Sequence, residues 1–411
     1  MKISRIECNN IKSFKNLSIN LIDFNVIIGL NGSGKSNFIL IFKFIKDILG
    51  SSLKEAINNQ GGAKQLRNYY EENGNSTIRL SFTLDFFSEL SSIINIHGID
   101  YEIRITKIDS DFEFEVIDNS DFKIKNDALK INIEYFNNKV KTGSSEIEIK
   151  RKDDIYLFQL NNYDSIDYEL YELFANIDEI KNKKYLCGDI IINSIFDDLF
   201  GIKLNNSPAK QISIYEFEQD LLSEIKFNSL IRDEKESSSH YTYLLYNVLN
   251  DENKRRQFFN LLSYVLPDYE DVKVHLDADK DHRIMVKERF YNRYIPANLL
   301  SNGTVFLMVI ILSLYFDEKH LTIFDEPERT IHPNVISKVV DMMKDVSNFK
   351  QIILSTHNPE IVKFSDIQNI LLIYRDEDGY SQISRPTNSK AVSTFLDNDI
   401  GLDELFVQNM L

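Results

Sequence analysis

The chain has 411 residues, of which 43% are hydrophobic and 27% are charged. This composition is ordinary for a globular protein, and the length is sufficient for two or three domains. The net charge of −16 provides no overall attraction for nucleic acid. Direct DNA binding is therefore less expected, although a local basic groove remains open as an alternative.

The two cysteines, Cys8 and Cys187, stand far apart and have no metal-ligand neighbours. This spacing indicates a reducing compartment and not a disulfide framework. The first residues enter an alternating pattern directly, without an apolar signal region. The longest apolar run, Phe306–Phe316, has eleven residues, which is too short to cross a bilayer and predicts a buried helix. We therefore expect a cytoplasmic protein that has no membrane partner.

Hydrophobic periodicity predicts the elements in chain order. Residues 2–28 read as strands and end in the buried strand 24–28, after which 37–45 read as a helix packed on a sheet. Alternating segments at 77–84, 101–105 and 129–135, separated by turns such as 118–121, predict an antiparallel meander. Apolar spacings of three and four predict mainly helices from 165 to 267, and strand–helix alternation returns after residue 298.

These changes in pattern divide the chain into four segments. We expect an N-terminal part at 1–90, an antiparallel β subdomain at 91–164, a mainly helical insertion at 165–265 and a C-terminal part at 266–411. The sequence shows no internal repeat and no heptad run long enough for a coiled-coil arm. The predicted class is α/β with a mixed central sheet.

A phosphate-binding loop stands at Gly29–Ser36, which fits the pattern G-x-x-x-x-G-K-[ST] between a strand and a helix. Its glycines allow backbone amides to close around phosphate oxygens at a helix N-terminus. Lys35 is predicted to reach the β and γ phosphates of ATP, and the Ser36 hydroxyl to ligate Mg²⁺. The flanking elements argue against an accidental glycine-rich turn. The other loop residues predicted to bind ATP are Asn31, Gly32, Ser33 and Gly34.

An apolar strand at 320–326 ends in two acids, Asp325 and Glu326. Asp325 is suited to hold the hydration shell of Mg²⁺, while Glu326 is suited to position or deprotonate the attacking water. Alone, such an ending is more often structural. Together with a phosphate loop it indicates hydrolysis.

Two further candidates lie at the ends of other elements. His357 follows the apolar strand 351–355, so on a neighbouring parallel strand it would emerge near Asp325 and contact the γ-phosphate. Ser301 and Gly303 precede a buried helix and form a turn whose amides suit an anion. In isolation the histidine would be structural, and the turn would be only a helix cap.

Together these elements resemble the ATPase heads of the ABC type. The branch is the one that contains structural-maintenance-of-chromosomes proteins, recombination-F-like repair ATPases and ATPases of prokaryotic anti-phage systems. The segments that carry the resemblance are Asn10–Phe14, Gly34–Asn37, Leu300–Thr304, Asp325–Pro333 and Ser355–Pro359. It covers residues 1 to about 90 and about 260 to 411, and it is thin in the middle.

The resemblance implies a P-loop head that shares its nucleotide with a second copy. The phosphate loop, extended by Asn37, would face Ser301 and Gly303 of the other protomer across ATP, in a homodimer or a higher even-numbered homo-oligomer. Family members also sense Mg²⁺ through a glutamine after the first helix. Gln60 and Gln65 are the candidates here, and Gln65 is preferred.

The sequence departs from the family pattern in one place and lacks one domain. Arg329–Ile331 occupies the stretch before His332-Pro333 where the family commonly carries glycine, so contact with a partner there is expected to differ. The overcoming-lysogenization-defect nucleases, which belong to the branch that this chain resembles, carry a Toprim domain of well over a hundred residues after the head. Because only 54 residues follow His357 (411 − 357), we expect no such nuclease in this chain.

Two local patterns are interpreted as structural. Residues 277–288 fit the spacing of a calcium-binding EF-hand loop, but His282 stands where the turn needs glycine, and the flanks alternate like strands. A polar hairpin tip is therefore the preferred interpretation. Lys254–Arg256 is interpreted as a solvated helix face, with contact to nucleic acid as the alternative.

The leading hypothesis is an ATPase that dimerises around ATP and regulates or senses for a separate effector, such as a nuclease, in prokaryotic anti-phage defence. The alternative is a DNA repair or recombination ATPase that acts directly on DNA, for which a basic groove formed in the dimer would be the evidence. A transporter ATPase is less consistent, because about two hundred residues interrupt the head.

Overall fold

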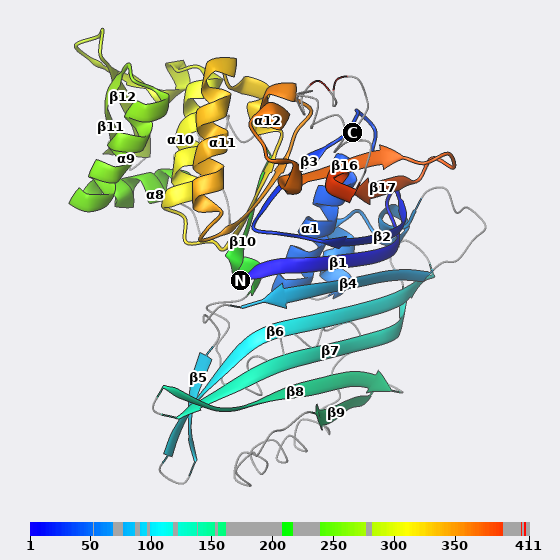
Figure 1. Ribbon diagram of the computed structural model, residues 1–411. Helices are drawn as coiled ribbons and strands as arrows, with labels where there is room; N and C mark the ends of the chain where they lie inside the picture. Colours follow the sequence, from blue (N-terminus) through cyan, green and yellow to red (C-terminus); the bar gives the residue numbers. More distant parts are fainter. Residues whose placement is uncertain are drawn as a thin grey trace. The chain divides into compact units, whose positions relative to one another are not determined.

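The computed structural model describes residues 1–51, 53–68, 77–86, 91–96, 99–117, 122–137, 139–152, 155–161, 208–216, 239–276 and 282–388, and the single residues 404 and 407 (Figure 1). The chain forms two compact units. The first comprises Met1–Ile22, Leu30–Ile212 and Ile373–Ser384, and the second comprises Asp23–Gly29, Ser213–Leu372 and Arg385–Leu411. The four-segment division stays a prediction, because these units are assembled from separated stretches of chain.

The first unit contains an eight-stranded antiparallel sheet (Figure 1). Its strands are β1 (Lys2–Ile11), β2 (Phe14–Asn20), β4 (Thr77–Asp85), β5 (Ser91–Ile96), β6 (Ile99–Val116), β7 (Phe122–Asn137), β8 (Val140–Lys152) and β9 (Ile155–Asn161). The order is β2-β1-β4-β6-β7-β8-β9, and β5 pairs with β6. The predicted meander is confirmed, and it continues into the N-terminal hairpin because β1 pairs with β4. The predicted turn at 118–121 lies outside the described residues.

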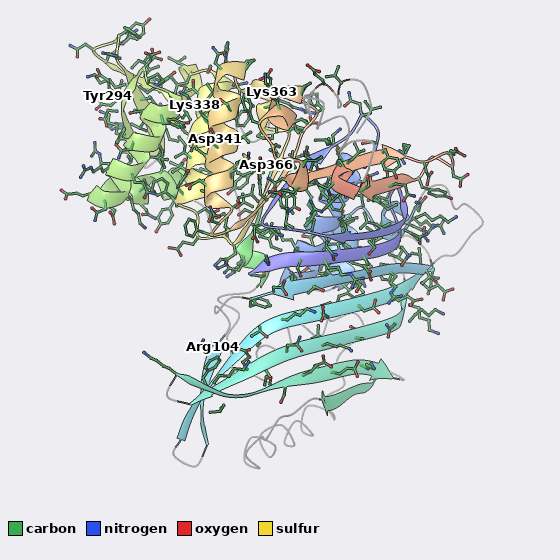
Figure 2. All side chains as sticks on the ribbon, viewed as in Figure 1. Arg104, Tyr294, Lys338, Asp341, Lys363 and Asp366 are labelled. Atoms are coloured by element: carbon green, nitrogen blue, oxygen red, sulfur yellow. The ribbon has the colours of Figure 1, made fainter. Side chains whose placement is uncertain are left out.

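Alternation along the long strands separates an apolar face from a charged one. Ile105, Ile108 and Phe112 of β6 are buried, as is Ser110, whereas the other residues between them are only partly buried. On the polar face Arg79 forms an ion pair with Asp111 at 2.8 Å. The guanidinium of Arg104, labelled in Figure 2, lies over the Phe136 ring at 4.1 Å.

The same unit contains the helix that follows the phosphate loop. Its helical elements are α1 (Lys35–Gly50), α2 (Leu53–Asn59), α3 (Ala63–Leu66) and the short 3₁₀ helix η2 (Pro208–Gln211). The helix predicted at 37–45 is therefore confirmed, and it is longer than expected. Phe38 of α1 packs edge-on against Phe14 at 6.1 Å and against Phe42 at 5.3 Å between ring centroids.

A six-stranded sheet, most of which lies in the second unit, has the order β10-β14-β15-β3-β16-β17. Its strands are β3 (Phe24–Ile28), β10 (Ile212–Glu216), β14 (Leu321–Asp325), β15 (Gln351–Ser355), β16 (Ile370–Arg375) and β17 (Ser381–Ser384). β14 and β16 are parallel to their neighbours β15 and β3, which are parallel to each other. Asp325 pairs in register with Ser355, and Ser355 with Ile27. The carboxyl ends of three strands from distant parts of the chain thus meet at one edge.

The remaining elements of the second unit cover this sheet or extend from it. The helices are α8 (Ser239–Asn250), α9 (Glu252–Val265), α10 (Asn302–Tyr315), α11 (Pro333–Val346) and α12 (Pro359–Lys363). The 3₁₀ helices are η3 (Ala297–Leu299), η4 (Pro327–Thr330), η5 (Ile367–Asn369) and η6 (Pro386–Asn388). A three-stranded sheet has the order β11 (Tyr269–Leu276), β12 (His282–Glu288), β13 (Tyr294–Pro296).

Helix α10 is buried from Thr304 to Leu314, as expected for a helix that is apolar on all sides. It begins at Asn302, four residues before the apolar run Phe306–Phe316 that predicted it. Helix α11 lies beside it in Figure 1 and is amphipathic, with Lys338 and Asp341 on its outer face (Figure 2). Both helices pack in one core with alternate residues of β3 and β15.

Two predictions for the middle of the chain are tested only in part. β11 and β12 pair as an antiparallel hairpin with Leu276 opposite His282, so the strand flanks of the EF-hand-like segment are confirmed. The tip at 277–281 lies outside the described residues. Within 165–265, α8 and α9 are helical as predicted, whereas 212–216 is strand β10, and 165–207 and 217–238 are not described. Among the described helices, none is both long and apolar enough to span a membrane.

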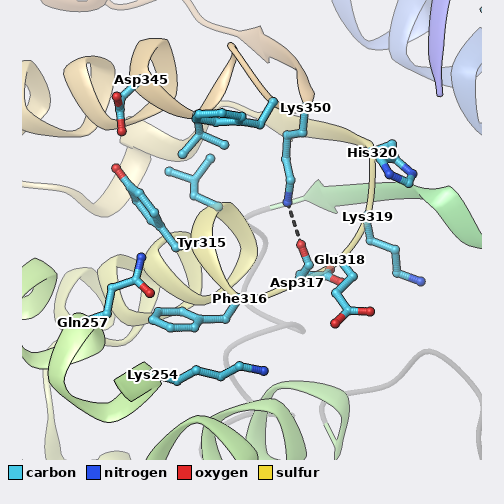
Figure 3. A pocket seen from close by; sticks show the side chains of 13 residues that line it. Lys254, Gln257, Tyr315, Phe316, Asp317, Glu318, Lys319, His320, Asp345 and Lys350 are labelled. Atoms are coloured by element: carbon cyan, nitrogen blue, oxygen red, sulfur yellow. Dashed lines mark hydrogen bonds between the residues drawn. The ribbon is translucent and has the colours of Figure 1, made fainter. Parts of the chain in front are cut away.

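A buried lysine ties α10 to the start of β15 beside a cavity of about 560 Å³ (Figure 3). Lys350 Nζ donates hydrogen bonds to the carbonyls of Ser313 and Asp317, each at 2.8 Å. Burial lowers the pKa of Lys350 from 10.5 to about 8, although the charge of Asp317 opposes the shift. The cavity is lined by cations and by acids, including Lys254 and Glu318, so its charge selects no class of ligand.

We predict that Lys350→Met removes a pH-dependent part of the stability. Folded Lys350 loses its proton near pH 8, whereas the unfolded chain retains it to higher pH. The unfolded state therefore binds more protons in this window, and wild-type stability should rise relative to the variant between pH 8 and 10 by ~1 kcal/mol per pH unit. Denaturant unfolding at each pH measures this difference. Lys254→Met, an exposed control, should keep the wild-type slope, and parallel curves for Lys350→Met would contradict the prediction.

Candidate nucleotide site

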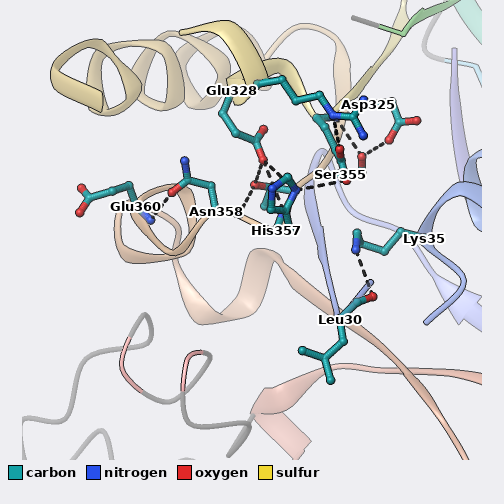
Figure 4. A network of polar contacts seen from close by, with 11 residues as sticks. Leu30, Lys35, Asp325, Glu328, Ser355, His357, Asn358 and Glu360 are labelled. Carbon is teal, nitrogen blue, oxygen red and sulfur yellow. Dashed lines mark hydrogen bonds and ion pairs between the residues drawn. The ribbon is translucent and has the colours of Figure 1, made fainter. Parts of the chain in front are cut away.

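The phosphate loop follows β3 and ends in the first turn of α1, which begins at Lys35. Gly32 and Gly34 have φ angles of 76° and 118°, in the left-handed region that only glycine adopts without strain. Lys35 is buried, and its Nζ donates to the Leu30 carbonyl at 3.3 Å (Figure 4). Ser36 is exposed in the first turn of α1. Its hydroxyl oxygen is therefore accessible as a ligand for a cation.

The other predicted loop residues occupy both sides of this turn. Asn31 is exposed, Ser33 is buried and Asn37 is half-buried. The Nδ2 of Asn37 donates to the hydroxyl of Ser13 at 2.8 Å. Ser13 belongs to the N-terminal motif 10–14 that carries part of the family resemblance. This bond gives the motif a structural role, because it anchors the first turn of α1 to the turn between β1 and β2.

The hairpin formed by β16 and β17 donates hydrogen bonds to the phosphate loop. The Ser381 hydroxyl donates to the Ser33 carbonyl at 2.5 Å and lies 2.7 Å from the Ser13 hydroxyl. Arg375 Nε donates to the Gly32 carbonyl at 2.9 Å. A Cβ placed on Gly34 would lie 2.2 Å from Ser381 Oγ, so the second glycine is required by packing as well as by its φ angle.

In the second unit, the carboxyl end of β14 carries the two predicted acids. Ser355 donates its hydroxyl to the carboxylate of Asp325. The backbone N–H of Glu326 lies 3.1 Å from both the carbonyl and the hydroxyl oxygen of Ser355. Glu326 has a φ of 49°, a left-handed conformation that non-glycine residues adopt only where neighbouring contacts hold them. The side chains of consecutive residues therefore diverge, as the assignment of separate roles to Asp325 and Glu326 requires.

The Glu326 carboxylate has two side-chain partners. Arg329 Nε lies 2.5 Å from Oε2, and His357 Nδ1 lies 3.2 Å from Oε1. Burial by itself would raise the pKa of Glu326, but the hydrogen bond and charge of Arg329, together with His357, hold this pKa below its ordinary value. The predicted pair Glu326 and His357 is thus in direct contact within the second unit.

Glu328 lies beside His357 and is buried (Figure 4). Its Oε1 accepts hydrogen bonds from the Thr356 hydroxyl and, at 3.3 Å, from the backbone N–H of His357. Burial raises its pKa despite these bonds, and Oε2 has no hydrogen-bond partner among the described residues. Glu328 is therefore placed to fix the backbone that carries His357.

Ser301 and Gly303 lie at the start of α10. The Ser301 hydroxyl accepts the Thr304 N–H at 3.1 Å, so this serine is the N-cap of the helix. Ser301 is nevertheless exposed, Gly303 is half-buried, and the adjoining Leu299 is 72% exposed. The turn is a helix cap, and it is also open to a second molecule.

The candidate Mg²⁺ ligands are oxygen donors on both units. Ser36 and Asp325 provide a hydroxyl and a carboxylate, the hard ligands that Mg²⁺ prefers alongside phosphate and water. Gln65 is exposed in α3, whereas Gln60 donates to Asp47 of α1 at 3.3 Å. Among the described residues, no group of three or more His, Cys, Asp or Glu side chains forms a metal site.

Sequence patterns missed several contacts around these residues. The sequence identifies Arg329 only as a departure from the family pattern, and Glu328 as part of a motif and as the next candidate base after Glu326. The three-residue spacing between Glu326 and Arg329 is the one signal in the sequence that could have indicated their ion pair. Ser381 and Arg375 belong to no motif, and the contact from Ser381 to Ser13 spans 368 residues.

The parallel strand order, the loop between β3 and α1 and the carboxylates at the end of β14 define a P-loop ATPase head of the ABC type. A family model described as "AAA domain, putative AbiEii toxin, Type IV TA system" matches residues 24–363. The chain belongs to this family.

The chain is also similar to the endonuclease GajA of Bacillus cereus (strain VD045), with 23% identity over 425 aligned positions. The match covers 96% of this chain and 64% of GajA, so the chain spans less than two thirds of that relative. Two solved structures share 14% identity. One is an Smc head bound to the C-winged helix domain of ScpA, with a TM-score of 0.48 and coverage of 93% of this chain and 98% of that one.

The other is the SMC head domain from Thermotoga maritima, with a TM-score of 0.42 and coverage of 94% and 99%, respectively. Because both TM-scores are below 0.5, neither likeness bears on the function of this chain. The fold assignment rests on the family match and on the strand order.

We predict that Ser381→Ala weakens the phosphate loop. The substitution removes the donor to the Ser33 carbonyl, and a buried acceptor left without its partner costs about 1–3 kcal/mol. The variant should unfold at a lower temperature and bind ATP several-fold more weakly, measured by thermal unfolding and by titration with a fluorescent ATP analogue. Ser384→Ala, on the same strand β17, is the matched control and should resemble wild type. Equal ATP affinity in Ser381→Ala would show that the hairpin does not support the loop.

Proposed function

We propose that this protein binds and hydrolyses ATP, that two copies close around the nucleotide, and that this cycle regulates a separate effector protein. The single observation that carries the proposal is the register at the edge of the parallel sheet. Asp325 and Ser355 are aligned with Ile27, one residue before the end of the strand from which the phosphate loop departs. A site for phosphate hydrolysis needs a phosphate cradle, a carboxylate for the metal shell and a base.

In the proposed reaction, Glu326 orients a water and accepts one of its protons. The water oxygen attacks the γ-phosphorus while the bond to the β-phosphate oxygen breaks, which yields ADP and phosphate. Lys35 and the loop amides bind the phosphate oxygens. Mg²⁺, held through Ser36 and Asp325, would supply charge that offsets the phosphates. His357, 3.2 Å from Glu326, is placed to couple the base to the γ-phosphate.

The exposed signature turn supports a shared site. Ser301 and Asn302 are exposed, whereas the helix that they begin is buried from Thr304 onward. A surface turn with amides at a helix N-terminus suits the phosphates of a nucleotide bound to another molecule. We propose a homodimer or a higher even-numbered homo-oligomer on this basis.

The proposed setting is a cytoplasmic prokaryotic defence system. Two observations support it: the motif resemblance to ATPases of anti-phage systems, and membership of a family named for a toxin–antitoxin system. The similarity to an endonuclease suggests a nuclease as the effector. Direct action on DNA has less support, because Arg255 of the basic triplet is paired with Asp271 at 3.2 Å.

We predict that Glu326→Gln retains ATP binding while hydrolysis falls by roughly 10²-fold or more. The amide is nearly isosteric with the carboxylate but cannot accept the proton, so the variant should accumulate as an ATP-bound dimer. ATP binding, phosphate release and size-exclusion chromatography measure the three properties. Lys35→Ala is the paired variant, and it should lose ATP binding because the loop loses its cation. Wild-type hydrolysis by Glu326→Gln would remove Glu326 from the mechanism, and undiminished affinity in Lys35→Ala would overturn the site.

Mixing two inactive variants tests the shared site. Ser301→Arg blocks the turn offered to the partner but leaves its own phosphate loop intact, whereas Lys35→Ala has the opposite defect. Each variant alone should be inactive, and a mixture should regain one working site per heterodimer. The ATPase rate should peak near equal amounts when subunit exchange has been confirmed by labelled chains. Zero activity at every ratio, or full activity of Ser301→Arg alone, would show that Ser301 is only a helix cap.

A further inference from the structure

Both carboxylate oxygens of Glu326 are engaged by protein groups. Oε2 receives a hydrogen bond from Arg329 at 2.5 Å, and Oε1 lies 3.2 Å from His357 Nδ1. A general base must direct a free oxygen lone pair toward the water that it activates. In this conformation, the oxygens of the proposed base are directed toward a guanidinium and an imidazole.

Glu326 itself is the constrained member of the pair. Its N–H is held by Ser355, its φ is 49°, and its side chain is only 14% exposed. A non-glycine residue in this left-handed region carries a strain of about 1–3 kcal/mol, which the contacts with Ser355 offset here. Rotation of the Glu326 backbone is therefore a costly way to free the carboxylate.

Arg329 is the member that can move. Its side chain is 56% exposed and projects from the short 3₁₀ helix η4, three residues after Glu326. Among the described residues, Glu326 is the one side chain with which Arg329 forms a hydrogen bond or ion pair. Ion pairs near the surface contribute little, so the guanidinium can leave at small cost.

We propose that Arg329 is a latch on the catalytic carboxylate: it holds Glu326 turned away from water, and its release permits hydrolysis. This inference rests on the proposed function of Glu326. Arg329 is a positioning residue and not a catalytic one, because it acts through Glu326.

The first test compares Arg329→Ala and Arg329→Lys with the matched control Lys363→Ala, which removes an exposed cation of the same unit. Arg329→Ala should raise kcat roughly two- to fivefold, the scale expected from loss of a weak ion pair, and leave KM for ATP unchanged. Arg329→Lys, which keeps a cation without the guanidinium geometry, should fall between wild type and Arg329→Ala. A kcat equal to that of Lys363→Ala, or a decrease in kcat, would overturn the latch.

The second test introduces Arg329→Ala into the Glu326→Gln background. A latch acts through the carboxylate, so the substitution should leave the residual rate of Glu326→Gln unchanged. An equal rise in both backgrounds would show that Arg329 acts elsewhere. If Glu326→Gln alone hydrolyses ATP at the wild-type rate, the proposed base fails, and that outcome is distinct from failure of the latch.

A third measurement requires no hydrolysis. The melting temperatures of wild type, the two single variants and the double variant form a thermodynamic cycle. Coupling between the two substitutions is expected if the ion pair exists in solution, because removal of either partner already removes the interaction. Additive changes would overturn the proposal even if the protein has no measurable ATPase rate.

Discussion

The hydroxyl and carbonyl of Ser355 hold together the groups on which the second unit's chemistry depends. The hydroxyl donates to Asp325, and both oxygens lie 3.1 Å from the N–H of Glu326. One serine thus orients the proposed metal-shell carboxylate and stabilises the left-handed backbone that turns the next side chain elsewhere. It can do so because parallel pairing brings the end of β15 beside the end of β14, where backbone hydrogen bonds fix the register residue by residue.

In the first unit, side-chain hydrogen bonds hold the phosphate loop in place. A loop that cradles phosphate must expose its amides, so it cannot satisfy its own polar groups by regular pairing. Here Ser381 and Arg375 donate hydrogen bonds to carbonyls of the loop, and Asn37 donates a hydrogen bond to Ser13. The rigidity of the loop therefore depends on residues from both ends of the chain.

Burial divides the two acids of the Glu326–Glu328 pair into different roles. Glu328 is buried, accepts hydrogen bonds from the residues that carry His357, and has a raised pKa. Glu326 is close to a cation and has a lowered pKa, so it remains ionised. The same residue type therefore serves as a structural acceptor at one position and as an ionised carboxylate paired with Arg329 two residues away. Their separation follows from the left-handed turn at Glu326, which directs the two side chains to different partners.

Local patterns were sufficient for the elements and for the motif residues. The apolar strand 24–28, the loop glycines, the buried helix before β14 and the alternating meander depend on short-range periodicity and backbone sterics, which are written in consecutive residues. The length of β6 and β7, the pairing of β1 with β4, and strand β10 within a segment expected to be helical were not predictable in this way, because strand pairing depends on partners distant in sequence. The ion pair of Arg329 with Glu326 and the support of the loop by Ser381 were likewise invisible to motif reading. The sequence by itself determined the ATPase family and proposed the residues of the site, because phosphate and metal chemistry demand particular side chains at fixed spacings. Only the tertiary structure decided which groups touch those side chains, because hydrogen bonds and burial depend on distances in space that the order of residues does not specify.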